Sequence, residues 1–574
     1  MKSWLFILFC LLPPLVGATT YYVDFASGNN ASAGTSQGTA WKNFPGTALN
    51  YDFSTFITGS GWPAGKIQPG DIIKVKSGTT YQTNGGFGMV RISTTHYSTA
   101  ATVANPILIQ RDTTWSSGAV TFDGTGMDIP TSGFGLFHAT IGGITWDGVT
   151  TEGFVFQNSP WRGLSSYTTA SRVEGISAYY CLFYNCGTAT PDDGTAATEG
   201  SIAMNNVTNG VVAYCRINGN GRHMNGIAFS DGGFWANNVF IHDCVITNHN
   251  CTDVVSGDWG IGVKCYNGSI TVSNCTLAYN FKGADNGLHN DGIDQTYKYI
   301  SNLIYSNFQA GLNGNGGAVL GRTNIETFYE INNTIHGNGT YGSYFYGGEM
   351  YLYIIGNLFH NNNIDDIFDG ANLVANNSSD GLEQAVFFVR AYNNIFYKQG
   401  GGVTRWNFQC QRWKIGSLPT NLTYEWDWNC FVQASSEPFA YIGSFVGASD
   451  NTAEFFYGAN GPGHASGNWY DYYGGTAVAP TNGSLGHFHS DVHSKGTGAS
   501  DTNLPPFLNP TINDYSLTTT YPGTNLTARS WYISEMGNSA DGTARYNWDI
   551  GPNDVSLFIL RRGPQKIRGV RFNK

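Results

Sequence analysis

Apolar and polar residues alternate in short runs along the chain, as in IIKVK at 72–76. An alternation of period two places one side of a strand in the core and the other towards solvent. Gly and Asn interrupt these runs about every eight to twelve residues, and no long stretch repeats apolar residues at the helical period. The pattern therefore predicts many short β-strands joined by tight turns.

A nine-residue phrase occurs eight times, at intervals of 24 to 37 residues. Its fifth residue is always apolar, its third is Cys in four copies and Asn in the next four, and its eighth is mostly Asn. The copies are YYCLFYNCG at 179, AYCRINGNG at 213, HDCVITNHN at 242, SNCTLAYNF at 273, ISNLIYSNF at 300, INNTIHGNG at 331, IGNLFHNNN at 355 and YNNIFYKQG at 392. Such agreement is typical of stacked coils, in which equivalent residues lie about 4.8 Å apart and amides can hydrogen-bond along the stack. The phrase predicts a solenoid, with its four Cys as a buried ladder rather than as metal ligands.

Both ends of this region resemble secreted right-handed β-helix proteins. YYVDFASGNN and QPGDIIKVKSGTTY resemble their opening cap, and NPTINDYSL with YNWDIG resembles their closing coils. We therefore expect one all-β domain over residues 19–555, a single-stranded right-handed parallel β-helix. Between 400 and 500 the phrase fades and Trp, Tyr and Gly become dense, which predicts long loops over the C-terminal coils.

The two termini differ from the rest of the chain. An apolar run from Trp4 to Val16 ends in small residues, which is typical of a cleavable signal peptide over residues 1–18. No other stretch has the length of apolar sequence that a membrane span needs. Residues 556–574 form a basic tail that we expect to be a frayed end. The protein is thus expected to be secreted, extracellular or periplasmic, with no membrane partner.

Composition narrows the class of partner. The net charge of -11 and the absence of an internal basic cluster argue against nucleic acid, because phosphate binding needs Lys and Arg gathered on one face. With 75 Gly, 14% aromatic and only 12% charged residues, the chain is rich in turns and rings. We expect a monomer that binds polysaccharide.

Ionisable residues concentrate in two successive repeats. Aligning the segments before the phrase gives NGIAFSD at 225, WGIGVKC at 259, DGIDQTY at 291 and GGAVLGR at 316. If Ile227, Ile261 and Ile293 point inward, this alignment directs Lys264 and Asp294 outward on adjacent coils. Close by, the sequence places the turn residues Asp258, His289, Asn290 and Asp291. All of these side chains are expected within about 10 Å.

Three interpretations of this cluster remain open. The oxygens of Asp258, Asn290, Asp291 and Asp294 are hard ligands of the kind Ca²⁺ prefers, and Ca²⁺ would acidify a uronate proton for β-elimination by Lys264 or His289. Without metal, Asp258 with Asp291 or Asp294 could serve as acid and base of a glycoside hydrolase. Alternatively, the residues only cap turns of a non-catalytic carbohydrate-binding or adhesin solenoid.

At these residues the chain resembles the Ca²⁺-dependent pectate lyases of polysaccharide lyase family 9. The matching stretches are GDWGIGVK at 257–264, LAYNFKGADNGLHNDGID at 277–294 and NGNGGAVLG at 313–321. The resemblance implies Ca²⁺ ligands at Asp258, Asn290, Asp291 and Asp294. Where the family has its catalytic Lys this chain has Val319, which cannot accept a proton. The role of base then falls to Lys264, His289 or Arg322.

The sequence therefore predicts a secreted polysaccharide lyase that cleaves a uronate-containing, pectate-like polysaccharide by Ca²⁺-assisted β-elimination. Lys264 is the leading base. Trp259 and Tyr297 are expected to offer ring faces to the sugar. The glycoside hydrolase is the first alternative and the binding solenoid is the second.

Overall fold

The structure is a computed structural model. It describes residues 17–49, 55–82, 90–127, 135–166, 172–187, 200–220, 224–229, 236–250, 260–266, 268–287, 294–316, 325–347, 350–363, 371–377, 387–398, 406–414, 422–427, 429–433, 440–446, 450–456, 488–489, 495–498, 507–509, 514–517 and 533–537. The expected signal peptide, most of the expected C-terminal loops and the basic tail lie outside these ranges. None of the helices within them is long and apolar enough to cross a membrane.

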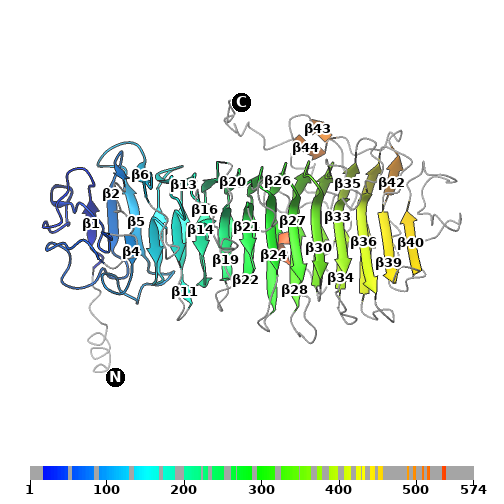
Figure 1. Ribbon diagram of the computed structural model, residues 1–574, viewed down its shortest axis with the longest axis horizontal. Coiled ribbons are helices and arrows are strands. Elements are labelled where there is room, and N and C mark those ends of the chain that lie inside the picture. Colours follow the sequence, from blue (N-terminus) through cyan, green and yellow to red (C-terminus); the bar gives the residue numbers. More distant parts are fainter. Residues whose placement is uncertain are drawn as a thin grey trace, which may run out of the picture. The chain divides into compact units, whose positions relative to one another are not determined.

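The chain forms two compact units. The first comprises Met1–Ala189 and Asn206–Arg216, and the second comprises Thr190–Asn205 and Ile217–Lys574. Each contains three parallel β-sheets, which we call A, B and C (Figure 1).

In the first unit, neighbouring strands of each sheet pair in parallel and come from successive coils. Sheet A contains β1 (Thr20–Val23), β2 (Ile72–Lys76), β5 (Ile107–Asp112), β8 (Ile144–Asp147), β12 (Ile176–Tyr179) and β16 (Val211–Ala213). Sheet B contains β4 (Val90–Ile92), β7 (Phe137–Ala139) and β10 (Leu164–Ser166). Sheet C contains β3 (Thr80–Gln82), β6 (Val120–Asp123), β9 (Phe154–Gln157) and β13 (Cys181–Tyr184). A short pair, β11 (Val173–Glu174) with β15 (Val207–Thr208), and the 3-10 turn η2 (Gln37–Thr39) complete it.

The second unit repeats this arrangement over more coils. Sheet A contains β19 (Ala236–His242), β22 (Gly268–Ser273), β25 (Gln295–Ile300), β28 (Glu326–Ile331), β31 (Met350–Ile355), β34 (Phe387–Tyr392), β37 (Leu422–Asp427) and β41 (Phe488–His489). Sheet B contains β14 (Gly200–Met204), β18 (Asn225–Phe229), β21 (Ile261–Cys265), β24 (Lys282–Gly287), β27 (Ala310–Gly316), β30 (Tyr341–Gly347), β33 (Ala371–Asn377), β36 (Trp406–Lys414), β39 (Ala440–Val446) and the antiparallel β40 (Asp450–Phe456). Sheet C contains β20 (Val245–Thr247), β23 (Thr276–Ala278), β26 (Leu303–Tyr305), β29 (Thr334–His336), β32 (Leu358–His360), β35 (Ile395–Lys398), β38 (Cys430–Gln433) and β42 (Lys495–Gly498).

β17 (Arg216–Asn218) also belongs to sheet C, and its first residue is part of the first unit while the other two are part of the second. Three further elements lie outside the three sheets: β43 (Phe507–Asn509) pairs antiparallel with β44 (Asp514–Leu517), and a 3-10 turn, η6 (Ser534–Gly537), follows.

The chain visits the three sheets of the second unit in a fixed order. β25 belongs to sheet A, β26 to sheet C and β27 to sheet B, after which β28 returns to sheet A beside β25. One such circuit is one coil of a solenoid, and parallel pairing of successive circuits defines a parallel β-helix. The predicted fold class is confirmed. The nine-residue phrase covers the end of a sheet A strand, a turn and the sheet C strand.

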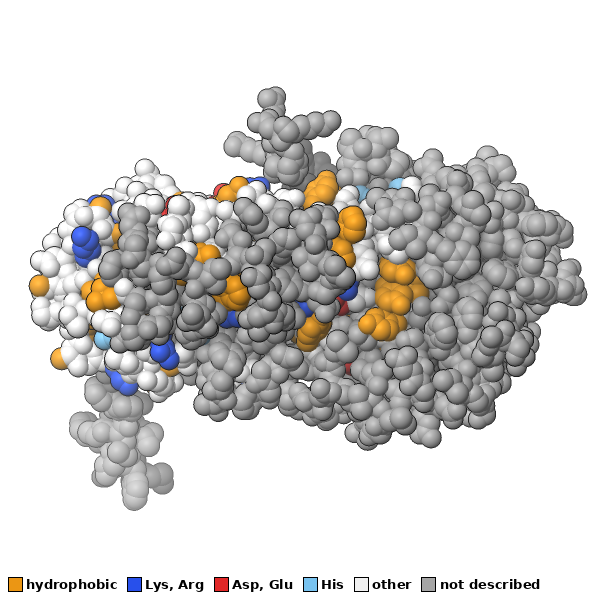
Figure 2. Space-filling view, in the orientation of Figure 1, with side chains coloured by type: hydrophobic (Ala, Val, Ile, Leu, Met, Phe, Trp, Pro, Cys, Tyr) orange, Lys and Arg blue, Asp and Glu red, His pale blue; other side chains and the backbone are white. Residues whose placement is uncertain are grey.

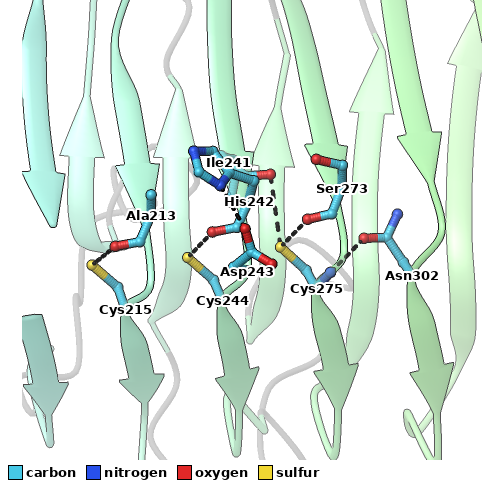
Figure 3. A network of polar contacts seen from close by, with 9 residues as sticks. All are labelled: Ala213, Cys215, Ile241, His242, Asp243, Cys244, Ser273, Cys275 and Asn302. Carbon is cyan, nitrogen blue, oxygen red and sulfur yellow. Dashed lines mark hydrogen bonds and ion pairs between the residues drawn. The ribbon is translucent and has the colours of Figure 1, made fainter. Parts of the chain in front are cut away.

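The turn between sheets A and C explains why the third phrase residue is Cys or Asn. The residue before it has a left-handed backbone, as at Asn274 (φ 52), Ser301 (φ 58) and Asn332 (φ 56). This conformation turns the next side chain into the interior, where Cys275 and Asn302 are almost fully buried. Figure 3 shows Cys244 and Cys275 at the position that Asn302 occupies later, each thiol donating to a backbone carbonyl at 3.2 Å. The cysteines of this ladder are free thiols among the described residues.

The asparagines link each coil to the next. The Asn333 Nδ2 donates to the Tyr299 carbonyl at 2.8 Å, and its Oδ1 accepts from the Asn302 backbone N–H at 2.8 Å. The same bonds recur along the ladder Asn302, Asn333, Asn357, Asn394 and Asn429. A second ladder, Asn280, Asn307, Asn338 and Asn362, follows the eighth phrase position and ends on Asn372 of β33. The predicted amide stacking is confirmed, and it satisfies polar groups that water cannot reach.

We expect Asn333→Ala to lower the free energy of unfolding by about 3 kcal/mol or more. The substitution leaves the buried Asn302 N–H and the Tyr299 carbonyl without their partner, and each such group costs about 1–3 kcal/mol. Asn105→Ala, at an exposed residue of the first unit, is the matched control. Chemical denaturation of both variants tests this, and equal stability would contradict a structural role for the ladder.

Candidate functional site

Lys264 lies on the outward side of sheet B. On β21 its neighbours Val263 and Cys265 point into the core, and all three are fully buried. Lys264 pairs in register with Asp285 of β24, which pairs with Asn313 of β27, which in turn pairs with Tyr344 of β30. These four side chains form one row over successive coils, about 4.8 Å apart. We call Lys264, Asp285, Asn313 and Tyr344 the sheet B row.

Asp285 is the centre of a hydrogen-bonded group in this row. Its Oδ2 accepts from the Lys282 ammonium at 2.9 Å, and its Oδ1 accepts from the Asn313 Nδ2 at 2.5 Å. Its side chain is only 5% exposed. The Lys264 ammonium lies 4.2 Å from the centre of the Tyr266 ring, a cation–π distance. The row therefore holds its charged groups in fixed positions.

Tyrosines continue the site beyond Asn313. Tyr344 stacks on Tyr341 with 4.5 Å between ring centroids, and Tyr346 lies 5.2 Å from Tyr344. Figure 2 shows blue and red side chains next to each other about halfway along the view, with orange side chains, a class that includes Tyr, beside them. Tyrosine rings next to fixed charges suit an oligosaccharide, which has both apolar and polar faces.

The structure corrects the predicted neighbour of Lys264. Asp294 does not lie on the strand equivalent to β21, because DGIDQTY leads into β25 of sheet A. The equivalent strand is KGADNG of β24, which brings Asp285 beside Lys264. The sequence alignment placed DGIDQTY opposite WGIGVKC by its distance from the nine-residue phrase. The loop before β25 is longer than the loop before β22, so the same distance from the phrase reaches sheet A instead of sheet B. The period-two pattern of Ala284, Asp285 and Asn286 in the sequence could have indicated that Asp285 points outward.

Asp294 lies at an exposed turn before β25. Its Oδ1 accepts the backbone N–H of Ile325 at 3.0 Å, which ties this turn to the next coil. The other predicted metal, base and sugar residues lie outside the described residues, namely Asp258, Trp259, His289, Asn290, Asp291 and Arg322. Within the described part of the chain, no three His, Cys, Asp or Glu side chains are grouped to hold a metal ion.

Tyr297 does not present its ring to solvent, which corrects the prediction that it contacts sugar. It is fully buried, stacks on Phe328 at 4.8 Å and donates its hydroxyl to the Gln295 side chain. Tyr297 alternates with Lys298, so on β25 it is Lys298 that points outward. The polar hydroxyl is accommodated because Gln295 accepts from it inside the coil.

The interior beneath the site carries a buried carboxyl group. Glu330 of β28 is 1% exposed, and its Oε1 accepts from the Ser343 hydroxyl of β30 at 2.5 Å. Its Oε2 has no hydrogen-bond partner among the described residues. Burial raises the pKa of Glu330 to about 8, because a charge in the core loses its hydration. Glu330 is therefore protonated in the folded protein at neutral pH.

The described groups limit the chemistry of the sheet B row. It offers an ammonium group at Lys264, an amide at Asn313 and one carboxylate at Asp285, and Lys282 beside the row supplies a second ammonium group to Asp285. Hydrolysis by an acid and a base would need a second carboxylate facing the first. Among the described outward residues of β21, β24 and β27, Asp285 is the single carboxylate. The row is thus better suited to amine-dependent proton transfer than to a carboxylate pair.

Comparison with known proteins gives no family. No protein-family model and no curated protein matches the chain. Among solved structures, the chain is 15% identical to a pectate lyase over 68% of this chain and 79% of the other, with a TM-score of 0.33. It is 12% identical to a rhamnogalacturonan lyase (68% and 84%, TM-score 0.36) and 9% identical to a protein in complex with xylose (94% and 98%, TM-score 0.44). The resemblance to polysaccharide lyase family 9 stays a prediction.

Glu330 makes stability depend on pH. The folded protein keeps a proton that the unfolded chain releases above its ordinary pKa of about 4.3, so the free energy of unfolding falls as pH rises from about 5 to about 8. The fall is at most about 1.4 kcal/mol per pH unit. We expect Glu330→Gln to be more stable than the wild type at pH 8 and close to it at pH 4.

Thermal unfolding across this pH range measures the effect. Glu174→Gln, at an exposed glutamate, is the control and should follow the wild-type curve. Parallel curves for wild type and Glu330→Gln would contradict a protonated core carboxyl.

Proposed function

We propose that the protein is a secreted polysaccharide lyase that cleaves a uronate-containing, pectate-like polysaccharide by Ca²⁺-assisted β-elimination. The observation that carries the proposal is the sheet B row, in which Lys264 stands one coil from Asp285 and two from Asn313. A sugar that lies along the coils would meet equivalent positions at about the strand spacing. Lys264 is fully buried, so the proposal requires that its amine become accessible when the sugar binds.

In β-elimination the base removes the proton on the carbon next to the uronate carboxylate. The electron pair of that C–H bond forms the new C=C bond, and the glycosidic oxygen departs with the other sugar unit and takes up a proton from water. Lys264 is the proposed base, and its amine must be unprotonated to accept the proton. Lys282 and Asn313, which both donate to Asp285, fix the neighbouring positions of the row.

The proposed Ca²⁺ ligands are residues identified in the sequence. Asp294 fits a ligand role, because it is exposed and its Oδ2 has no partner among the described residues. Asp258, Asn290 and Asp291 are the other proposed ligands, and their oxygens are of the type that Ca²⁺ prefers. When bound, Ca²⁺ would neutralise the uronate carboxylate and acidify the adjacent proton.

The first test incubates the purified protein with uronate and neutral polysaccharides. Ultraviolet absorbance of unsaturated uronates and release of reducing ends are recorded together. A lyase raises both with a uronate polymer only. Reducing ends without absorbance would favour the hydrolase, and the absence of both signals would favour a binding solenoid.

Lys264→Met should lower the turnover rate by about 100-fold or more, because general-base catalysis contributes roughly that factor. Lys264→Arg keeps the charge but accepts a proton poorly, so it should bind substrate and remain slow. Lys66→Met, at an exposed lysine of the first unit, should be as active as the wild type. Activity of Lys264→Met at the wild-type rate would remove Lys264 from the mechanism.

Asp291→Ala should lose both Ca²⁺ binding and activity, whereas Lys264→Met should keep Ca²⁺ binding. The metal is followed directly, as the rise in melting temperature on adding Ca²⁺ and its reversal by chelator, since a ligand of the folded state raises stability. Asp243→Asn, at an exposed carboxylate directly after β19, is the control. An unchanged Ca²⁺ response in Asp291→Ala would refute this ligand set.

A further inference from the structure

A second row of outward side chains lies on sheet A of the second unit. Lys298 of β25 pairs in register with Tyr329 of β28, Tyr329 with Tyr353 of β31, and Tyr353 with Arg390 of β34. Each of these residues alternates with inward neighbours such as Tyr297 and Phe328. We call Lys298, Tyr329, Tyr353 and Arg390 the sheet A row.

The row is held together by contacts between cations and rings. The Lys298 ammonium lies 5.8 Å from the Tyr329 ring centre, and Tyr329 stacks on Tyr353 at 4.7 Å with an interplanar angle of 11°. The Arg390 guanidinium lies 5.4 Å from the Tyr353 ring and donates to its hydroxyl at 3.2 Å. It also lies 5.7 Å from the ring of Phe388. A positive group therefore stands at each end of a tyrosine pair, in a fixed position.

The row is partly open to solvent and bounded on one side. Lys298, Tyr329 and Arg390 are half-buried. The next outward row, Ile300, Ile331, Ile355 and Tyr392, is covered by Met536 of η6, and Ile533 packs beside it. The same covered cluster includes Tyr353, which is 7% exposed, and Tyr329 packs against it. Lys298, Tyr329 and Arg390 are therefore the members of the sheet A row that solvent reaches.

The charge along this face has one sign. Among the described outward side chains of β25, β28 and β31 there is no carboxylate, because Glu326 and Glu330 are buried on the inward side. Lys298 and Arg390 stand three coils apart, about 14 Å.

We propose that the sheet A row is a non-catalytic binding site for an anionic polysaccharide. Carboxylates of a uronate polymer pair with Lys298 and Arg390, and the hydroxyl of the half-buried Tyr329 hydrogen-bonds to a sugar unit between them. Tyr353 is buried and holds Arg390 in place through its hydroxyl. The two rings stack on each other, so Tyr329 presents its edge and hydroxyl rather than its face. Because the contacts already fix the cations, binding loses little side-chain entropy. Nucleic acid is not the favoured occupant, because phosphate binding needs many Lys and Arg gathered on one face, and this row holds two cations about 14 Å apart.

The proposal is independent of catalysis at the sheet B row, and it is tested by binding rather than turnover. Calorimetry with a soluble oligouronate is carried out on the Lys264→Met protein, so that the ligand is not cleaved. Adding Lys298→Met and Arg390→Met should remove one class of binding site and leave any site at the sheet B row. Lys66→Met, which removes a charge elsewhere, should leave the isotherm unchanged. An isotherm unaffected by the double substitution would overturn the proposal.

A second, site-specific measurement on the wild-type protein does not depend on whether the double variant folds. In the wild-type protein, acetylation of Lys298 by an amine-reactive ester should slow at least about threefold with oligouronate present and stay unchanged with a neutral oligosaccharide. Tyr329→Phe keeps the ring stack but removes a hydroxyl, and it should weaken binding about threefold. Equal acetylation rates with and without oligouronate would refute the site, whether or not the protein proves to be a lyase.

Discussion

Hydrogen bonding between successive coils is the constraint on which this structure depends. Each coil contributes one strand to each of three sheets, and parallel strands pair only if consecutive coils keep their register. The turns must therefore repeat as faithfully as the strands. A left-handed residue followed by a buried Asn achieves this: the Asn333 Nδ2 donates to the Tyr299 carbonyl of the coil before it and to the Asn357 Oδ1 of the coil after it. Polar groups at the corners of the interior are satisfied without water.

The same regularity places chemistry on the surface. Alternate residues of a strand point outward, and equivalent residues stack, so a polar side chain on one coil acquires neighbours at the same position on the next. The sheet B row and the sheet A row both arise in this way. They differ in content: one joins lysines, a carboxylate, an amide and a tyrosine, and the other places two cations around two tyrosines. A long polymer suits such rows, because its units also repeat along a line.

Two buried polar groups in the interior of the second unit have a partner across the coil. Tyr299 donates its hydroxyl to Asn286 at 2.8 Å, and Ser343 donates to Glu330. Both bonds join sheet A to sheet B beneath the sheet B row. Glu330 avoids a buried charge by keeping its proton, which the folded protein allows only while the pH stays below its raised pKa. These bonds across the coil join the two sheets, although burying polar groups costs more free energy than burying apolar ones.

The sequence by itself determined the strands, the coils and the ladders. Residues at the third phrase position, such as Cys275 and Asn302, recur once per coil, and a repeat of this kind is visible without coordinates. The outward direction of Lys264 also followed from alternation alone. Its neighbour did not: only the tertiary structure decided that Asp285 lies beside Lys264, that Asp294 belongs to another sheet, and that Tyr297 is buried. The physical reason is that loop lengths vary between coils, and a strand acquires its side-by-side partners only through hydrogen bonds with another coil.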